Sequence, residues 1–203
     1  MNLITEPVSS SSHVLRAIQT IFPDMSLANG PWIAGGACRR IVENDEIGTS
    51  DIDLFFRDAI SFEMTERYLY EGMGTGRSWK VRNHSKFPKS YKIEVEFETK
   101  KYEFQLLGIR FYDSVEHLMS DFDFTACMLA TDGKELIRHA DALDDLKSRT
   151  LRFNVSPTVA KPARLAKYLD HGFTPVPGVL TTMLGVDLKS FDFTNEVLEQ
   201  DDY

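Results

Sequence analysis

Two aspartates, Asp51 and Asp53, stand two residues apart in the apolar run Asp-Ile-Asp-Leu-Phe-Phe. Because successive side chains of a β-strand point to opposite faces of the sheet, we expect both carboxylates on one face and Ile52 and Leu54 in the core. Neighbouring acids repel each other and are costly to desolvate, so such a pair requires a cation. The pattern indicates metal binding, because carboxylate oxygens are ligands that Mg²⁺ prefers.

A glycine pair precedes these acids in the chain. Gly35 and Gly36 end a short apolar segment, and the residues that follow, 37–45, have a helical pattern. Glycine lets the backbone approach a ligand closely, and a helix N-terminus offers free N–H groups and a positive dipole end to a phosphate. Ser50, directly before the two acids, can donate a hydrogen bond to a phosphate or act as a turn residue. We therefore expect the chemistry of the chain to lie at this stretch.

The remaining elements must hold these residues in place, and their order indicates the fold class. Helical patterns occupy 13–22, 37–45, 61–71, 141–148 and 162–171, and strand patterns occupy 31–34, 52–56, 79–82, 91–98 and 102–110. Ser61 is the expected cap of one helix, and Asp113 with Glu116 forms a capping box for another. This mixed order predicts an α+β fold with a mixed or antiparallel sheet flanked by helices. We expect a head domain over residues 1–153 and a short helical neck with an acidic tail over 154–203.

Composition sets the class of protein. The chain has 203 residues, is 42% hydrophobic and carries a net charge of −8. It shows neither a long apolar run typical of a membrane span nor a secretory signal pattern, so we expect no membrane partner. Its two cysteines, Cys38 and Cys127, lie in apolar contexts, which is typical of buried thiols in the cytoplasm. The sequence gives no indication of oligomeric state.

Positive charge is concentrated in one stretch. Between Gly72 and Ile93 there are six Lys or Arg residues and no acid, although the whole chain is acidic. One interpretation is a solvated hairpin, and the other is a basic wall that binds an RNA end or a polyphosphate. The side chains assigned to an RNA end are Arg77, Lys80, Arg82, Lys86 and Lys89.

Several segments together resemble a known family. Gly35-Gly36, fourteen residues and then Asp51-Ile-Asp53 resemble the signature of the polymerase-β nucleotidyltransferase superfamily, and more narrowly the head domain of bacterial poly(A) polymerases and CCA-adding enzymes. The resemblance continues in order through Arg39 of Gly-Gly-Ala-Cys-Arg-Arg, Asp123 of Asp-Phe-Thr-Ala-Cys-Met-Leu-Ala, and the helical segment that begins at Pro162. It covers roughly residues 30–173.

The resemblance implies a metal-dependent transfer of a nucleoside monophosphate from a nucleoside triphosphate (NTP) to a hydroxyl, with release of pyrophosphate. The implied acceptor is an RNA 3′ end, a tRNA or another hydroxyl, so the resemblance implies a magnesium-dependent transferase that acts in RNA processing. The implied ligands of Mg²⁺ or Mn²⁺ are Asp51 and Asp53, and the implied nucleotide contacts are Gly35, Gly36, Arg39 and Ser50.

The third carboxylate has two candidates. The resemblance aligns Asp123 with a family aspartate, and we favour it on that ground. Strand alternation favours Glu103, because in Tyr-Glu-Phe-Gln-Leu-Leu it shares one face with Gln105. A solvated outward face for Glu103 and a helix-end cap for Asp123 are the simpler interpretations.

Departures from the family pattern leave alternatives open. Asp121-Phe122 replaces an arginine pair that holds the nucleotide, and the base-selecting motif of the neck is replaced by a stretch containing Lys161, Arg164 and, further on, Lys167. No counterpart of the tRNA-gripping body follows, so we expect no CCA addition. A catalytically inactive nucleotide-binding or assembly module is one alternative function. A toxin-type transferase that modifies a protein or a small molecule is another.

Overall fold

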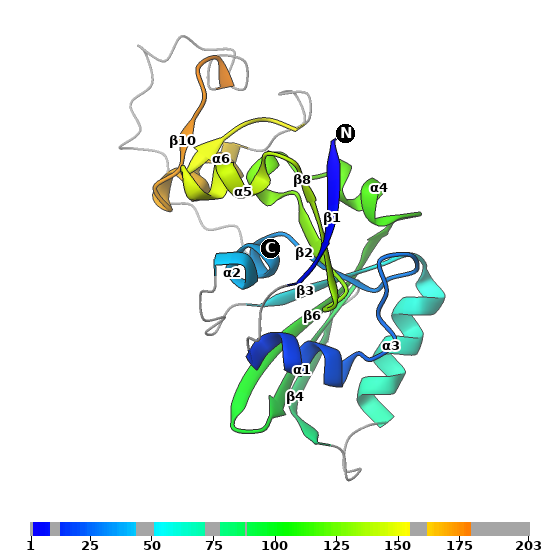
Figure 1. The fold of residues 1–203 in the computed structure, drawn as a ribbon. Helices are drawn as coiled ribbons and strands as arrows, with labels where there is room; N and C mark the ends of the chain where they lie inside the picture. The colour runs from blue at the N-terminus through cyan, green and yellow to red at the C-terminus, as the bar shows by residue number, and fades with distance from the viewer. Residues whose placement is uncertain are drawn as a thin grey trace.

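The computed structural model describes residues 2–8, 13–43, 51–71, 78–87, 89–154 and 162–179 (Figure 1). Within these residues the main sheet has the strand order β1-β8-β7-β2-β3-β6-β5-β4. Its strands are β1 (Leu3–Pro7), β2 (Trp32–Ala34), β3 (Ile52–Phe56), β4 (Trp79–Phe87), β5 (Ser90–Phe97), β6 (Lys100–Phe111), β7 (Leu129–Thr131) and β8 (Glu135–His139). Strands β3 and β6 are parallel, whereas the other neighbours are antiparallel. The α+β prediction with a mostly antiparallel sheet is confirmed.

One face of the sheet carries the larger hydrophobic core. Inward-facing residues of the central strands, such as Leu54 and Phe104, pack there with buried residues of three helices, including Ile18, Cys38 and Leu69. The helices are α1 (His13–Ile21), α2 (Gly36–Glu43) and α3 (Ala59–Glu71). Alternation in β3 therefore turns its even-numbered residues into this core and leaves Asp53 and Phe55 on the opposite face.

The opposite face is divided into two halves. Helix α4 (Val115–Ser120) covers β2, β7 and β8, where Leu118 and Met119 pack with Trp32 and Met128 in a second core. The half formed by β3, β6, β5 and β4 lies outside this second core in the described part of the chain, except for Phe55 of β3, which packs against it. We call this the open half-face. Because the strands alternate, it carries the polar residues of β5 and β6.

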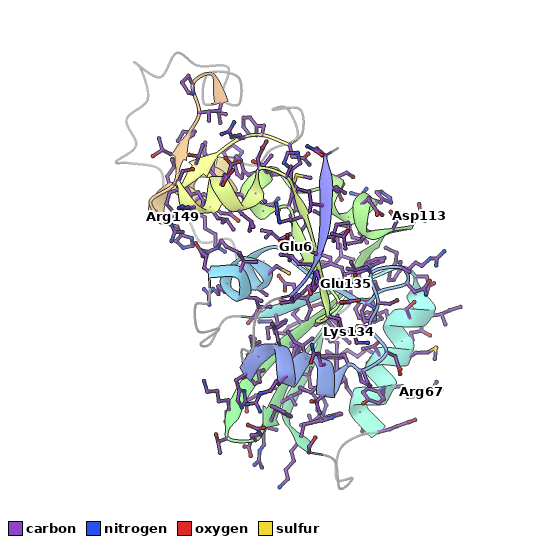
Figure 2. The ribbon with its side chains drawn as sticks, in the orientation of Figure 1. Glu6, Arg67, Asp113, Lys134, Glu135 and Arg149 are labelled. Carbon is purple, nitrogen blue, oxygen red and sulfur yellow. The ribbon has the colours of Figure 1, made fainter. Side chains whose placement is uncertain are left out.

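The C-terminal elements gather at one end of the molecule, as Figure 1 shows for α5, α6 and β10. They are the 3₁₀-helix η1 (Thr125–Cys127), α5 (Ala142–Lys147), β9 (Thr150–Leu151), α6 (Pro162–Asp170) and β10 (Thr174–Pro175). Arg149, labelled at this end in Figure 2, forms an ion pair with Glu43 of α2 at 3.2 Å and lies 5.1 Å from the ring centre of Phe173. This contact joins α2 to the segment that leads into β10.

Two of the helix caps that we predicted from local residue patterns are wrong. Asp58, not Ser61, caps α3, since its carboxylate accepts from the Ser61 amide at 2.7 Å and from the Ser61 hydroxyl at 2.5 Å. Helix α4 is capped by Ser114, which accepts from the amide of His117 at 3.2 Å, so the Asp113–Glu116 box is wrong. In both cases the helix begins one turn or less from the expected residue, and a neighbouring oxygen has the better reach to the free N–H groups.

Candidate active site

Strand pairing places three carboxylates together on the open half-face. In the parallel pair of β3 and β6, Ile52 lies opposite Phe104 and Asp53 lies opposite Gln105. This register brings Glu103 beside Asp51, and both side chains are only partly exposed. We call Asp51, Asp53 and Glu103 the carboxylate site. It lies where β2 ends and β3 begins.

A lysine from the next strand lies between two of these acids. The Nζ of Lys92 donates to Asp51 Oδ2 at 2.8 Å and to Glu103 Oε1 at 3.0 Å. These hydrogen bonds raise the pKa of Lys92, so it is an ammonium at neutral pH. Burial acts to raise the pKa of Asp51, but hydrogen bonding with Glu103 and Lys92 outweighs it and lowers the pKa. One positive charge thus serves two carboxylates.

Asp53 is in a different electrostatic position. Burial raises its pKa from 3.8 to about 6, and the negative charge of Asp51 adds to the shift, while Lys92 and Lys167 partly oppose it. In the part of the chain that the structure describes, no hydrogen bond or ion pair to the Asp53 carboxylate is recorded. With three carboxylates and one lysine ammonium, the site carries two negative charges more than Lys92 compensates, which is the condition in which a divalent cation binds.

The glycine pair lies beside the carboxylates at the start of α2. Gly35 has φ +70°, a backbone conformation that favours glycine, and a Cβ there would only touch the Phe122 ring, at 3.4 Å. A Cβ on Gly36 would meet no atom within 4 Å, so the space in front of this residue is open. The first N–H groups of α2 face no intrahelical partner and are suited to an anion. This geometry fits the expected triphosphate contact.

Arg39 and Ser50 complete the list of expected nucleotide contacts. The guanidinium of Arg39 forms an ion pair with Glu43 one turn along α2, at 2.6 Å, and is mostly buried. Arg39 is therefore held on α2 close to the glycine pair. Ser50 lies outside the described residues.

Asp123 is not grouped with the carboxylate site. Its side chain is 4% exposed, and its Oδ2 accepts from the Arg164 guanidinium of α6 at 2.9 Å. Its backbone carbonyl accepts from the amide of Asn154 at 2.8 Å. These contacts join the segment after α4 to α6, so the geometry of Asp123 is that of a paired, buried anchor.

Residues from other elements bring cations and an aromatic ring to the same region. Lys167 of α6 is near enough to Asp53 to lower its pKa.

The two residues that replace the arginine pair of the resembling poly(A) polymerases and CCA-adding enzymes have other partners. Phe122 packs beside Gly35 and lies edge-to-face with Phe55, with 6.5 Å between the ring centres. Asp121, the other replacement, is ion-paired with Arg110. Lys161 lies outside the described residues.

Sequence reasoning missed Lys92 as a member of the site. Lys92 belongs to the basic run, but the strict alternation of apolar and charged residues from Ile93 to Glu98 also extends back by one residue to include it. That extension places Lys92 on the same strand face as Glu94 and Glu96. A lysine that begins an acidic strand face is a signal that could have located it.

The basic run is more neutralised than its composition suggests. Arg82 donates to both carboxylate oxygens of Glu96, at 2.8 and 2.7 Å, and Lys86 forms an ion pair with Glu66 at 2.6 Å. Lys80 and Lys89 are exposed, and Arg77 lies outside the described residues. The predicted RNA contact therefore has less uncompensated positive charge than expected.

The donor set fits a hard divalent cation. Among residues 2–8, 13–43, 51–71, 78–87, 89–154 and 162–179, no three His, Cys, Asp or Glu side chains form a ready-made metal cluster. The carboxylates of Asp51 and Glu103 nevertheless converge on one cation, the Lys92 ammonium. Two oxygen donors around a bound cation, with Asp53 beside them, are the arrangement and ligand type that Mg²⁺ uses with phosphate oxygens and water.

Comparison with known proteins gives the family. The model of the Gabija anti-defense 2 family matches residues 10–149, which is well over half of the chain and includes all three residues of the carboxylate site. The chain belongs to the Gabija anti-defense 2 family. A curated member, Gabija anti-defense 2 of Bacillus phage SPbetaL7, is 31% identical over 155 residues, which are 72% of this chain and 34% of that protein. The chain thus spans about a third of the length of this relative.

Solved structures of similar shape share the fold. The Thermotoga maritima CCA-adding enzyme in complex with tRNA matches 89% of this chain and 45% of its own, with a TM-score of 0.59 and 15% identity. A tRNA-processing enzyme matches 88% of this chain and 48% of its own, with a TM-score of 0.60 and 20% identity. The Bacillus stearothermophilus CCA-adding enzyme in complex with CTP matches 85% and 42%, with a TM-score of 0.56 and 15% identity. The family member therefore has a polymerase-β nucleotidyltransferase-like fold, as the sequence resemblance predicted.

A membrane span is a separate question. Within the described ranges, no helix of this family member combines the length and the hydropathy that crossing a lipid bilayer requires.

Proposed function

We propose that the chain is a metal-dependent nucleotidyltransferase that moves a nucleoside monophosphate from an NTP to a hydroxyl and releases pyrophosphate. The observation that supports this proposal is the convergence of Asp51, Asp53 and Glu103 on one sheet face, next to the open backbone at Gly36. The nucleotidyltransferase-like fold is consistent with it, and the carboxylate site supplies the chemistry that the fold alone does not imply.

Asp51, Asp53 and Glu103 are the side chains that would hold Mg²⁺ or Mn²⁺ in this proposal. When bound, the metal supplies charge stabilisation to the attacking and leaving oxygens of the α-phosphate. The N–H groups at the start of α2 bind the triphosphate, and Gly36 leaves room for it. A bond forms between the acceptor oxygen and the α-phosphorus, the bond to pyrophosphate breaks, and the hydroxyl proton passes to a site carboxylate or to water.

We assign the third acid to Glu103 rather than to Asp123. Glu103 shares a cation with Asp51, whereas Asp123 is almost fully buried and already bonded to Arg164. A carboxylate that must bind a new cation needs free oxygen lone pairs and access to solvent, and only Glu103 has both in this arrangement. This assignment departs from the sequence preference for Asp123.

The first candidate acceptor is a hydroxyl of a protein or of a small molecule, and the second is a hydroxyl of an RNA. Two of the basic side chains expected to contact RNA are engaged in ion pairs, and the net charge of −8 opposes binding to a phosphate backbone. The CCA-adding enzymes of similar fold bind tRNA, according to the complex with the Thermotoga maritima protein, so an RNA end is the second candidate.

Label transfer tests the reaction. The protein is incubated with each α-labelled NTP, Mg²⁺ or Mn²⁺, and either cell lysate or purified total RNA, and labelled acceptors are separated by size and by nuclease or protease sensitivity. We expect transfer with at least one NTP, and Asp51→Ala/Asp53→Ala should reduce it at least about a thousandfold. Asp24→Ala/Asp113→Ala removes the same charge from exposed positions and is the matched control. Transfer that persists in the Asp51/Asp53 double variant would contradict the proposal.

We further propose that this transfer serves the anti-defence role given in the family's name. Expression of the protein in a host that carries a Gabija system should restore phage growth, and the Asp51→Ala/Asp53→Ala variant, at equal abundance, should not. Full activity of that variant in the infection assay would separate anti-defence from catalysis and favour a binding module.

A further inference from the structure

Lys92 occupies the position between Asp51 and Glu103 that the proposed metal requires. Its Nζ lies 2.8 Å from one carboxylate oxygen and 3.0 Å from the other. An ammonium and a divalent cation cannot share these two oxygens, because both need the same lone pairs and they repel each other. We infer that Lys92 is a tethered counter-ion that competes with the metal and must be displaced when the metal binds. This inference rests on the proposed function.

The sheet register explains why this lysine reaches both acids. Lys92 lies opposite Gln105 on β6, and Gln105 lies opposite Asp53 on β3. The Lys92 side chain extends diagonally to the adjacent cross-strand row, where Glu103 and Asp51 are neighbours. A long, flexible side chain can make this diagonal contact and can also leave it without any change in the backbone.

Other lysines on the same face have different partners. Lys101 forms an ion pair with Glu94 at 3.0 Å, but it is 62% exposed and lies away from Asp51. Lys92 is 35% exposed and has two partners. Among the described residues, Lys92 is the lysine that hydrogen-bonds the carboxylate site, and Lys101 forms an ion pair of similar length outside it.

Competition by Lys92 has a defined consequence for the protein without metal. The ammonium stabilises Asp51 and Glu103 while the site waits for substrate, so the folded state does not carry two adjacent uncompensated charges there. The same contact weakens metal binding, since part of the binding free energy is used to break it. Removal of the lysine charge should destabilise the metal-free protein and strengthen metal binding at the same time.

Direct measurement of Mn²⁺ binding tests this inference in the full chain. Free Mn²⁺ is followed by electron paramagnetic resonance in titrations of the unmodified protein, Lys92→Met and Lys101→Met. We expect Lys92→Met to lower the Kd for Mn²⁺ about tenfold, which corresponds to loss of a charge-assisted contact of about 1.4 kcal/mol. Lys101→Met should stay within about twofold of the unmodified protein. Lys92→Gln is a second variant that keeps a polar group should Lys92→Met fold poorly.

A second measurement needs no variant. Amine acetylation of the unmodified protein, read by peptide mass spectrometry, should increase severalfold at Lys92 when Mn²⁺ is added and remain unchanged at Lys101. Equal Mn²⁺ affinity in the unmodified protein and in Lys92→Met, or unchanged acetylation of Lys92, would overturn the inference and leave the proposed function intact. If the unmodified protein and both variants are folded but bind no Mn²⁺, the metal site of the proposed function is overturned, and the inference with it.

Discussion

Asp145 and Asp53 are chemically identical residues in opposite situations. Asp145 of α5 is completely buried, but its carboxylate accepts from the Arg152 guanidinium at 2.8 Å and from the Thr125 hydroxyl. Asp53 is less buried, yet the charge that shifts its pKa most is that of another acid, Asp51. The two carboxylates thus differ in partners more than in burial.

This difference separates acids that hold the fold from acids that are available to a ligand. Asp145 joins α5, η1 and the start of the segment after β9, and Asp123 likewise joins its segment to α6 through Arg164. The carboxylate site has three acids and one lysine. A buried charge with its own partner contributes to structure, whereas a group of acids with too few cations is retained at a cost in stability.

The largest expected effect on stability is at Asp145, the acid that has its own buried partners. Asp145→Ala should lower the free energy of unfolding by about 3–4 kcal/mol, because it leaves the Thr125 hydroxyl without its buried acceptor and opens a cavity at a fully buried position. Asp144→Ala, an exposed acid in the same helix turn, is the matched control and should change it by less than about 1 kcal/mol. Urea unfolding followed by circular dichroism measures both. Similar losses for the two variants would remove the distinction between the classes of acid.

The second prediction tests which acid belongs to which class. Glu103→Gln should reduce label transfer about a hundredfold, or about 2.7 kcal/mol, with little change in melting temperature. Asp123→Asn should lower the melting temperature, since it weakens the contact with Arg164, and should reduce transfer less than Glu103→Gln does. Initial rates are normalised to the folded fraction. The reverse pattern would restore the assignment of the third acid to Asp123.

The last prediction is a gain in stability at Asp53. Its pKa in the folded protein is about 6, above the ordinary 3.8, so the unfolded chain releases this proton more readily. Stability therefore falls as pH rises between these two values, and the full cost is present above pH 6. Asp53→Asn should raise the free energy of unfolding by up to about 3 kcal/mol at pH 8 and by almost nothing below pH 4, while it abolishes transfer. Urea unfolding at both pH values measures this, and destabilisation at pH 8 would contradict the unpaired state of Asp53.

Local patterns in the sequence were sufficient for the faces of the strands. Alternation placed Asp51 and Asp53 on one face, and the same rule placed Glu103 with Gln105, as the register of β3 and β6 confirms. The glycine pair before α2 was also readable, because a positive φ and an open approach both favour glycine. These features depend on residues close together in the chain.

Features that depend on distant segments could not be predicted. The pairing of Lys92 with Asp51 joins residues 41 positions apart, and Asp123 with Arg164 does the same over another 41. Strand β1 carries little apolar alternation and was not expected. It pairs with β8, and its Glu6 side chain forms an ion pair with Arg138. Tertiary packing decides such contacts, so a motif aligned by resemblance, such as Asp123, can point to a carboxylate that the fold uses otherwise.

The parallel pairing of β3 with β6 has a consequence for how the protein is made. An antiparallel neighbour can be added by a tight turn, but a parallel one requires a long crossover, and here α3 and the hairpin of β4 and β5 intervene. Asp51 and Asp53 are synthesised well before Glu103, and they cannot meet it until the intervening crossover has been made. Contacts of such sequence separation form late, after local elements have collapsed. The carboxylate site therefore exists only once the parallel pairing of β3 with β6 is complete, and a nascent or partly unfolded chain lacks it.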